Sequence, residues 1–259
     1  MSIFRQFFLA QWKGLVIWAI GGALYSLATT NSAPSFINTN ALAAMPPSLL
    51  KMMGDIGGLS PVDGYVALTI AKALTVVPVL YAVILALSVV TREVDKRTAE
   101  FLLALPVGRG QILAARAAVL GVNITTVVVV TWAALRFTLP AQGYQASWGP
   151  LGLVFVSVWL LSLACGAITL AASMWIDDYS VGIKLFLGLA TVAFILDYVL
   201  KAAGVSRVWR LLSPFSYVSA ADIMRTGSIA TLDWLVPVLA VVVSLVVSFR
   251  AFSRKQFAA

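Results

Sequence analysis

Long uninterrupted apolar runs dominate this sequence and limit what the chain can fold into. A bilayer core about 30 Å thick is crossed by about 20 helical residues, because each residue adds about 1.5 Å. Runs of about this length cover residues 14–30, 66–91, 112–138, 149–175, 181–200 and 232–249. Strands of a membrane β-barrel would have about ten residues of alternating polarity. The runs therefore predict an all-α integral membrane protein with six transmembrane helices.

The composition agrees with a single membrane domain. Hydrophobic residues make up 61% of the 259 positions and charged residues 11%, which leaves no polar segment long enough for an independent domain. We therefore predict one transmembrane domain over residues 1–259. The absence of histidine excludes His-based catalysis and His ligation of metals, and Cys165 alone cannot form an intrachain disulfide.

The formal net charge of +8 comes from basic residues in short clusters between the apolar runs. This placement is typical of membrane orientation and headgroup contact, and it does not indicate nucleic-acid binding. With the N-terminus inside, eleven of the 18 Lys and Arg flank inner ends of runs, six flank outer ends, and Lys72 lies within a run. The bias predicts that both termini are cytoplasmic.

Three segments outside the runs have the pattern of surface helices. Residues 1–13 carry Phe and Trp at helical spacings, which predicts an elbow helix along the inner interface, serving as an anchor or as part of a dock for a partner. Residues 46–53 begin with two prolines and continue with Leu and Met, and residues 208–212 set Trp and Leu beside arginines. Both predict short external interfacial helices.

Residues 92–109 hold the densest charge of the sequence. Charged residues occupy the start of the segment and apolar residues its end, where Pro106 and Gly108 should terminate a helix. The pattern predicts a short amphipathic cytoplasmic helix between the second and third runs. Such a helix either inserts into a groove of a partner, with Arg97 and Glu100 setting the register, or anchors the loop at the membrane surface.

The same segment carries a resemblance to a known family. From Glu93 to Arg109 it reads E-V-D-K-R-T-A-E-F-L-L-A-L-P-V-G-R, followed by G-Q-I-L. This string resembles the signature E-x-x-x-G-T-x-E-x-L-L-x-x-P-x-x-R-x-x-I-L of ABC-2-type permeases, the membrane subunits of many bacterial ATP-binding-cassette exporters. Arg97 stands where that pattern has glycine, which changes the local turn. Residues 212–217 and 59–64 resemble two further segments of the family.

The resemblance implies where an ATPase would dock. In the family this segment is the coupling helix, so the residues implicated in ATPase coupling are Glu93, Arg97, Thr98, Glu100, Phe101, Leu102 and Leu105. Asp177 and Asp178, in the short loop 176–180, are expected to meet basic residues of the same ATPase.

The resemblance also implies an assembly and an activity. Two permease copies, identical or homologous, would pair in the bacterial cytoplasmic membrane, each with one cytoplasmic ATPase subunit. Their activity would be export of an amphipathic compound, a peptide antibiotic or a lipid-like molecule. No G-x-x-x-x-G-K-[ST] loop occurs in the sequence. We therefore expect no enzyme site and no cofactor in this chain, and place ATP and Mg on the partner ATPase.

Ionisable residues inside apolar runs need an account, because each costs about 2.5–3.5 kcal/mol at the centre of a bilayer. Lys72 either snorkels to the outer surface or lines a transport pathway. Arg116 and Lys184 stand near inner ends of runs. Asp197 can pair with Lys201 one turn away. A secondary carrier is disfavoured, since no inverted repeat and no mid-membrane carboxylate is evident. An assembly or sensor subunit without transport activity remains the main alternative.

Overall fold

The computed structural model describes residues 3–39, 45–46, 56, 58–70, 74–95, 108–176, 178–206, 209 and 211–254. Regular structure in these residues is helical throughout, as predicted, and none of it is strand. In chain order the helices are α1 (Ile3–Asn38), α3 (Pro61–Thr69), α4 (Val76–Asp95), α6 (Arg109–Ala141), α7 (Trp148–Ala172), η2 (Ser173–Trp175), α8 (Tyr179–Ala202), η3 (Pro214–Tyr217), α10 (Ala220–Thr226) and α11 (Thr231–Arg254).

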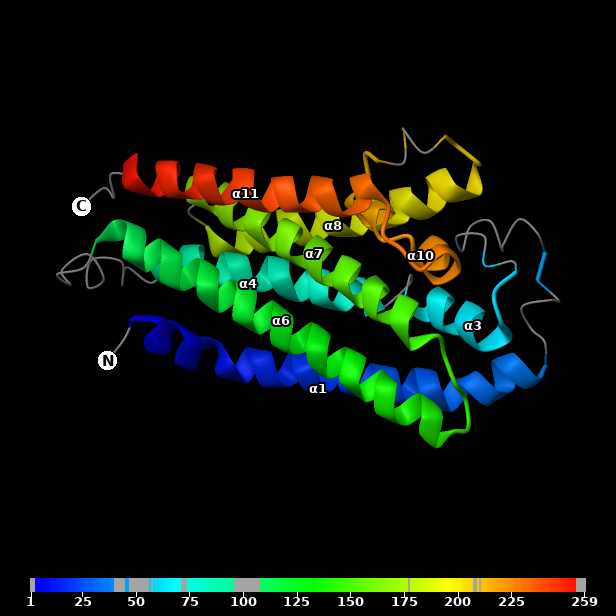
Figure 1. Ribbon diagram of the computed structural model, residues 1–259. Helices are drawn as coiled ribbons and strands as arrows, with labels where there is room; N and C mark the ends of the chain where they lie inside the picture. Colours follow the sequence, from blue (N-terminus) through cyan, green and yellow to red (C-terminus); the bar gives the residue numbers. More distant parts are fainter. Residues whose placement is uncertain are drawn as a thin grey trace.

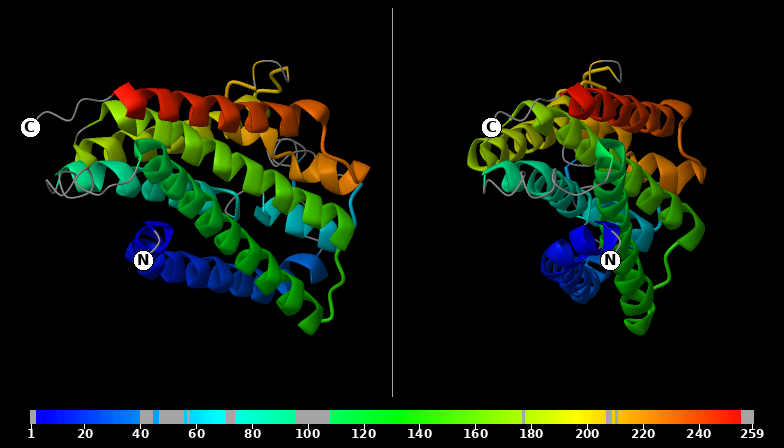
Figure 2. Two further views of the ribbon diagram at one scale, coloured as in Figure 1. Left: turned by 60° about the vertical axis from the view of Figure 1, so that its left-hand side comes forward. Right: turned by 90° about the vertical axis from the view of Figure 1, so that its left-hand side faces the viewer.

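The long helices lie side by side along one axis, with both termini at one end of the bundle and α3 and α10 at the other (Figure 1). Helix α7 packs against α4, α6, α10 and α11, and in the left view of Figure 2 it runs between α11 and α6. Within the most apolar stretch of α7, 56% is buried in the bundle. The corresponding buried share is 11% for α1, 6% for α8 and 17% for α11. Helix α7 is therefore the core, and the other three present apolar surface outward.

Five described helices are long and apolar enough to cross a membrane, one fewer than predicted. They are α1, α6, α7 together with η2, α8 and α11, and they contain the predicted runs 14–30, 112–138, 149–175, 181–200 and 232–249. For helix α4 the structure describes side chains only over Val76–Ser88, an apolar stretch that by itself is shorter than a full crossing. The sixth crossing therefore stays a prediction.

The second predicted run, residues 66–91, is divided between α3 and α4. The Thr75 amide donates a hydrogen bond to the Ile70 carbonyl at 3.1 Å, and the Thr75 hydroxyl donates to the same oxygen at 2.8 Å. This backbone bond spans five residues, as in a π-turn, and so departs from the α-helical ladder. Pro78 then lies in the first turn of α4, where its missing N–H removes no helical hydrogen bond.

Helix α1 is a single element of 36 residues and about 54 Å. The separate elbow helix predicted for residues 1–13 is not confirmed, because residues 3–13 continue into the first run as one helix. No proline separates the two segments, and Gly14 alone does not end a helix.

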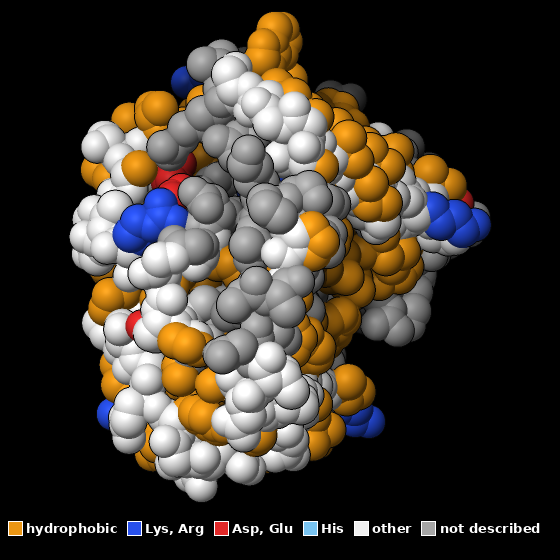
Figure 3. All heavy atoms as spheres, turned by 90° about the vertical axis from the view of Figure 1, so that its right-hand side faces the viewer, with side chains coloured by type: hydrophobic (Ala, Val, Ile, Leu, Met, Phe, Trp, Pro, Cys, Tyr) orange, Lys and Arg blue, Asp and Glu red, His pale blue; other side chains and the backbone are white. Residues whose placement is uncertain are grey.

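The end opposite the termini shows few charged side chains, which stand toward its margin with apolar side chains between them (Figure 3). Of the external surface helices predicted there, most of residues 46–53 lies outside the described residues. Trp209 and Leu212 are exposed, in agreement with the interfacial pattern of their segment. Helix α10 was not predicted; it packs against α3 and α7, with Ile223 and Met224 buried.

The contact between α1 and α6 relies on small and hydroxylated residues. Gly22, Ser26 and Thr30 recur every fourth residue of α1 and share one face. The Ser26 hydroxyl donates to the Thr131 carbonyl at 3.2 Å, and the hydroxyls of Thr30 and Thr138 are 2.8 Å apart. A Cβ at Gly22 would overlap the Thr131 hydroxyl. Such close approach is typical of helices that pack within a membrane.

Gly22→Leu should therefore destabilise the protein by about 1–3 kcal/mol, because the added side chain forces α1 away from α6. The matched control is Gly21→Leu, since a Cβ at Gly21 meets nothing within 4 Å. The measurement is the thermal unfolding midpoint of each variant in mild detergent. Equal midpoints for the two leucine variants would contradict the close α1–α6 contact.

Candidate functional site

The predicted coupling segment joins two helices at the end of the bundle that carries both termini. Helix α4 ends there at Asp95 and α6 begins there at Arg109 (Figure 1). Glu93 lies in the last turn of α4. The remaining predicted coupling residues, Arg97, Thr98, Glu100, Phe101, Leu102 and Leu105, lie outside the described residues. Their roles in ATPase docking stay predictions.

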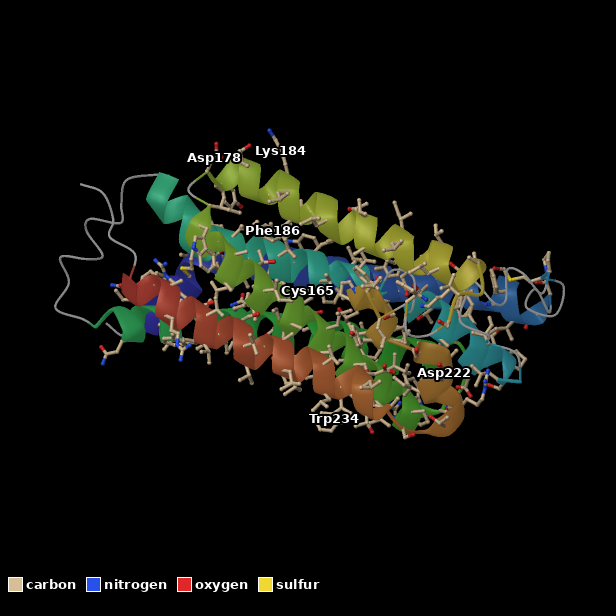
Figure 4. The ribbon with its side chains drawn as sticks, turned by 90° about the horizontal axis from the view of Figure 1, so that it is seen from above. Cys165, Asp178, Lys184, Phe186, Asp222 and Trp234 are labelled. Atoms are coloured by element: carbon tan, nitrogen blue, oxygen red, sulfur yellow. The ribbon has the colours of Figure 1, made fainter. Side chains whose placement is uncertain are left out.

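The connection between α7 and α8 lies at the same end, where Figure 4 labels Asp178 and Lys184 on the first turns of α8. The Asp178 carboxylate caps this helix by accepting hydrogen bonds from the amides of Ser180 at 2.7 Å and Val181 at 3.0 Å. Asp178 is nevertheless exposed, and Lys184 points away from the bundle. Asp178 thus has a structural role in addition to its predicted docking role, while Asp177 lies outside the described residues.

Arg116, which stands near the inner end of a predicted run, is buried in the same half of the bundle. Only 5% of the residue is exposed. Its guanidinium carbon lies 5.1 Å from the ring centroid of Phe7 on α1 and 5.8 Å from that of Phe252 on α11. Arg116 therefore contacts the first and the last long helix by cation–π interactions.

A polar pair fully buried between helices was missed by the sequence reasoning. The Tyr81 hydroxyl on α4 donates to Asn123 Oδ1 on α6 at 2.9 Å, and Asn123 Nδ2 donates to the Val119 carbonyl at 2.7 Å. The ring of Trp18 on α1 lies 5.5 Å from that of Tyr81. An asparagine deep in a span was the available signal, because such residues commonly bind a neighbouring helix.

An apolar hollow of about 380 Å³ lies between α6 and α7. Its lining residues are Thr125, Val128, Val129, Trp132, Gly152, Phe155, Val156 and Trp159. The Trp159 indole N–H donates to the Thr125 hydroxyl at 2.9 Å, which satisfies one of the few polar groups on its wall. The hollow can accommodate hydrocarbon, such as an acyl chain or the apolar part of an amphipathic molecule.

The other ionisable residues singled out in the sequence differ in what the structure shows of them. Asp197 pairs with Lys201 at 2.6 Å, as predicted, and is buried. Lys72, the candidate pathway residue, lies outside the described residues. No group of three or more Cys, Asp or Glu in the described part of the chain could hold a metal ion.

Polar contacts tie the helices together at the end away from the termini. Asp63 on α3 accepts hydrogen bonds from the amide and the hydroxyl of Ser147 at 2.8 and 2.9 Å. The guanidinium carbon of Arg136 on α6 lies 4.2 Å from the ring centroid of Trp148 on α7. These contacts fix the turn between α6 and α7 relative to α3.

Together, the outward apolar faces and the buried interhelical polar contacts define a multi-pass α-helical membrane protein. Comparison with known families identifies it further, because the family model described as "ABC-2 family transporter protein" matches residues 9–257. The chain therefore belongs to the ABC-2 family of transporter proteins, as the resemblance of residues 93–113 predicted. No match is found among curated proteins.

The buried pair of Tyr81 and Asn123 is expected to stabilise the contact between α4 and α6. Tyr81→Phe leaves Asn123 Oδ1 without its donor, so the expected loss is about 0.6–2 kcal/mol of unfolding free energy. Tyr144→Phe is the control, because its hydroxyl makes only an exposed contact of 3.4 Å. The measurement is chemical unfolding in detergent micelles, and equal stability of the two Phe variants would contradict the prediction.

Proposed function

We propose that this chain is the permease subunit of an ABC transporter that exports an amphipathic, peptide or lipid-like compound. A separate ATPase subunit supplies the energy by docking at the end of the bundle that carries both termini. Membership of the ABC-2 family supports the permease role, since proteins of this family generally work with an ABC ATPase and dimerise.

The observation that carries the proposal is the convergence of two predicted docking segments. Residues 96–107 lie between the ends of α4 and α6, and Asp178 lies at the start of α8. All three helix ends are at the end of the bundle that carries the termini (Figures 1 and 4). One ATPase surface can therefore contact both segments, and a push there acts on α4, α6 and α8 together.

The outer surfaces of the bundle suit a second permease copy and lipid. Helix α8 exposes Val181, Leu185, Leu189, Val192, Ile195 and Val199, and α1 and α11 expose similar apolar side chains. We infer that the complex contains two permease copies, with the remaining apolar surface in contact with the acyl chains of the bilayer. The apolar hollow between α6 and α7 supports a substrate or lipid with a hydrocarbon part.

The docking role is tested by co-purification. The permease carrying Leu102→Asp or Glu100→Arg should retain less than about a tenth of the ATPase that the wild type retains, because a buried charge or a reversed charge disrupts a coupling helix in its groove. The measurement is the molar ratio of ATPase to permease after purification in mild detergent.

Leu212→Asp is the matched control for Leu102→Asp. Leu212 is 70% exposed and lies in the segment that joins α8 to α11, on the side away from the termini. Full retention of the ATPase by the Leu102→Asp variant would rule out docking at this segment. A wild-type permease that retains no ATPase would favour an assembly or sensor subunit instead.

The proposed orientation places the termini in the cytoplasm. In a Cys165→Ala background, which removes the single cysteine, we introduce Gln6→Cys on α1 or Ser228→Cys after α10; both positions are exposed. An impermeant maleimide should label the Ser228→Cys variant in intact spheroplasts and the Gln6→Cys variant only after permeabilisation. The reverse pattern would show that the proposed orientation is wrong.

A further inference from the structure

Arg116 lies at a junction of three helices. It belongs to α6, and its guanidinium contacts Phe7 near the start of α1 and Phe252 near the end of α11. Both rings are buried, with 8% and 4% of the residues exposed. A cation inside a membrane bundle is costly and is by default associated with function. Membership of the family and the proposed docking segment leave this arrangement unexplained.

Arg116 also lies close to the proposed dock along the chain. Helix α6 begins at Arg109, directly after residues 96–107, and Arg116 follows seven residues later. Two turns of a regular helix, about 10 Å, separate the two residues. A displacement of the start of α6 therefore reaches Arg116 through a rigid element.

The terminal helices have few other buried side chains at this end. Among residues 4–21 of α1, only Phe7 and Leu15 are buried, and among residues 249–252 of α11 only Phe252 is buried. At each helix end a buried phenylalanine touches Arg116, beside partly buried neighbours such as Phe8 and Ala251. The contact with this arginine is the feature that the two attachments share.

We propose that Arg116 is a positioning residue that makes the inner ends of α1 and α11 follow the start of α6. When the ATPase displaces the start of α6, the Arg116 guanidinium carries Phe7 and Phe252 with it through its cation–π contacts, and three helices move as one body. The planar guanidinium can stack on two rings, whereas a lysine ammonium is a compact charge and cannot replace that geometry. This inference rests on the proposed docking of an ATPase at residues 96–107.

The test measures the movement of each helix separately. The wild-type complex with its co-purified ATPase is placed in nanodiscs of phosphatidylethanolamine and phosphatidylglycerol, with Cys165→Ala and one spin label per permease copy. The label is placed at Gly110 on α6, at Leu9 on α1 or at Phe249 on α11, all of which are exposed. Adding ATP and Mg should change the distance between the two copies' labels at each of the three positions.

Arg116→Met should uncouple the terminal helices from α6. The change at Gly110 should persist, while the changes at Leu9 and Phe249 should be lost, because the contact that couples these helices to α6 is removed. Arg116→Lys should reduce the changes at Leu9 and Phe249 less than Arg116→Met does, since lysine keeps the charge but lacks the planar guanidinium. Phe252→Leu is a milder variant that should reduce the change at Phe249 and leave that at Leu9.

The matched control is Arg136→Met, which removes a similar cation–π contact at the other end of α6, over Trp148. It should leave all three distance changes at wild-type size. Unaltered changes at Leu9 and Phe249 in the Arg116→Met variant, or an unaltered change at Phe249 in the Phe252→Leu variant, would overturn the proposal. Loss of all three changes with the ATPase still bound would also overturn it, since Arg116 would then support the whole bundle. A wild-type complex without an ATPase would refute the docking proposal itself, and this inference with it.

Discussion

The structure depends on how helices can hold each other once they are already in an apolar medium. Lipid tails are as apolar as leucine, so burial of hydrocarbon between helices adds little in a bilayer. Association of the helices must therefore come from close approach of their backbones and from buried polar contacts between them. Gly22 lets α1 approach Thr131 of α6. Gly166 lets α7 approach α4 and α6, since a Cβ added there would lie 3.3 Å from Ala82 Cβ and 3.3 Å from Leu120 Cδ2. The bundle is therefore organised around its small and polar residues.

This constraint separates a tightly held interior from loosely held outer helices. Helix α7 is surrounded by neighbours, whereas α8 buries few of its residues and α1 is attached mainly along α6. Elements with few buried contacts are the ones that can rearrange at low free-energy cost. A transporter that alternates between two states needs such elements around a rigid core, and the fold provides both.

The sequence predicted the elements whose signal is a long apolar run and missed those that depend on contacts across the fold. The spans over residues 149–175 and 181–200 agree closely with the observed helices, because length and hydropathy alone define them. The π-type turn at Thr75, the burial of Arg116 and the pairing of Asn123 depend on which helices become neighbours. Asn123 lies within the predicted run 112–138, and its polarity was the available clue.

Helix α4 is enclosed by other helices, and this position shields it from the lipid. The part of α4 whose side chains the structure describes, Val76–Ser88, extends about 20 Å. Val79, Ala82, Leu85 and Ala86 are buried against other helices, so this segment meets protein on most of its circumference. Hydrophobic mismatch acts only on surfaces that touch acyl chains. A thicker or thinner bilayer would therefore tilt or strain the long outer helices, while α4 would sense the change only through its neighbours.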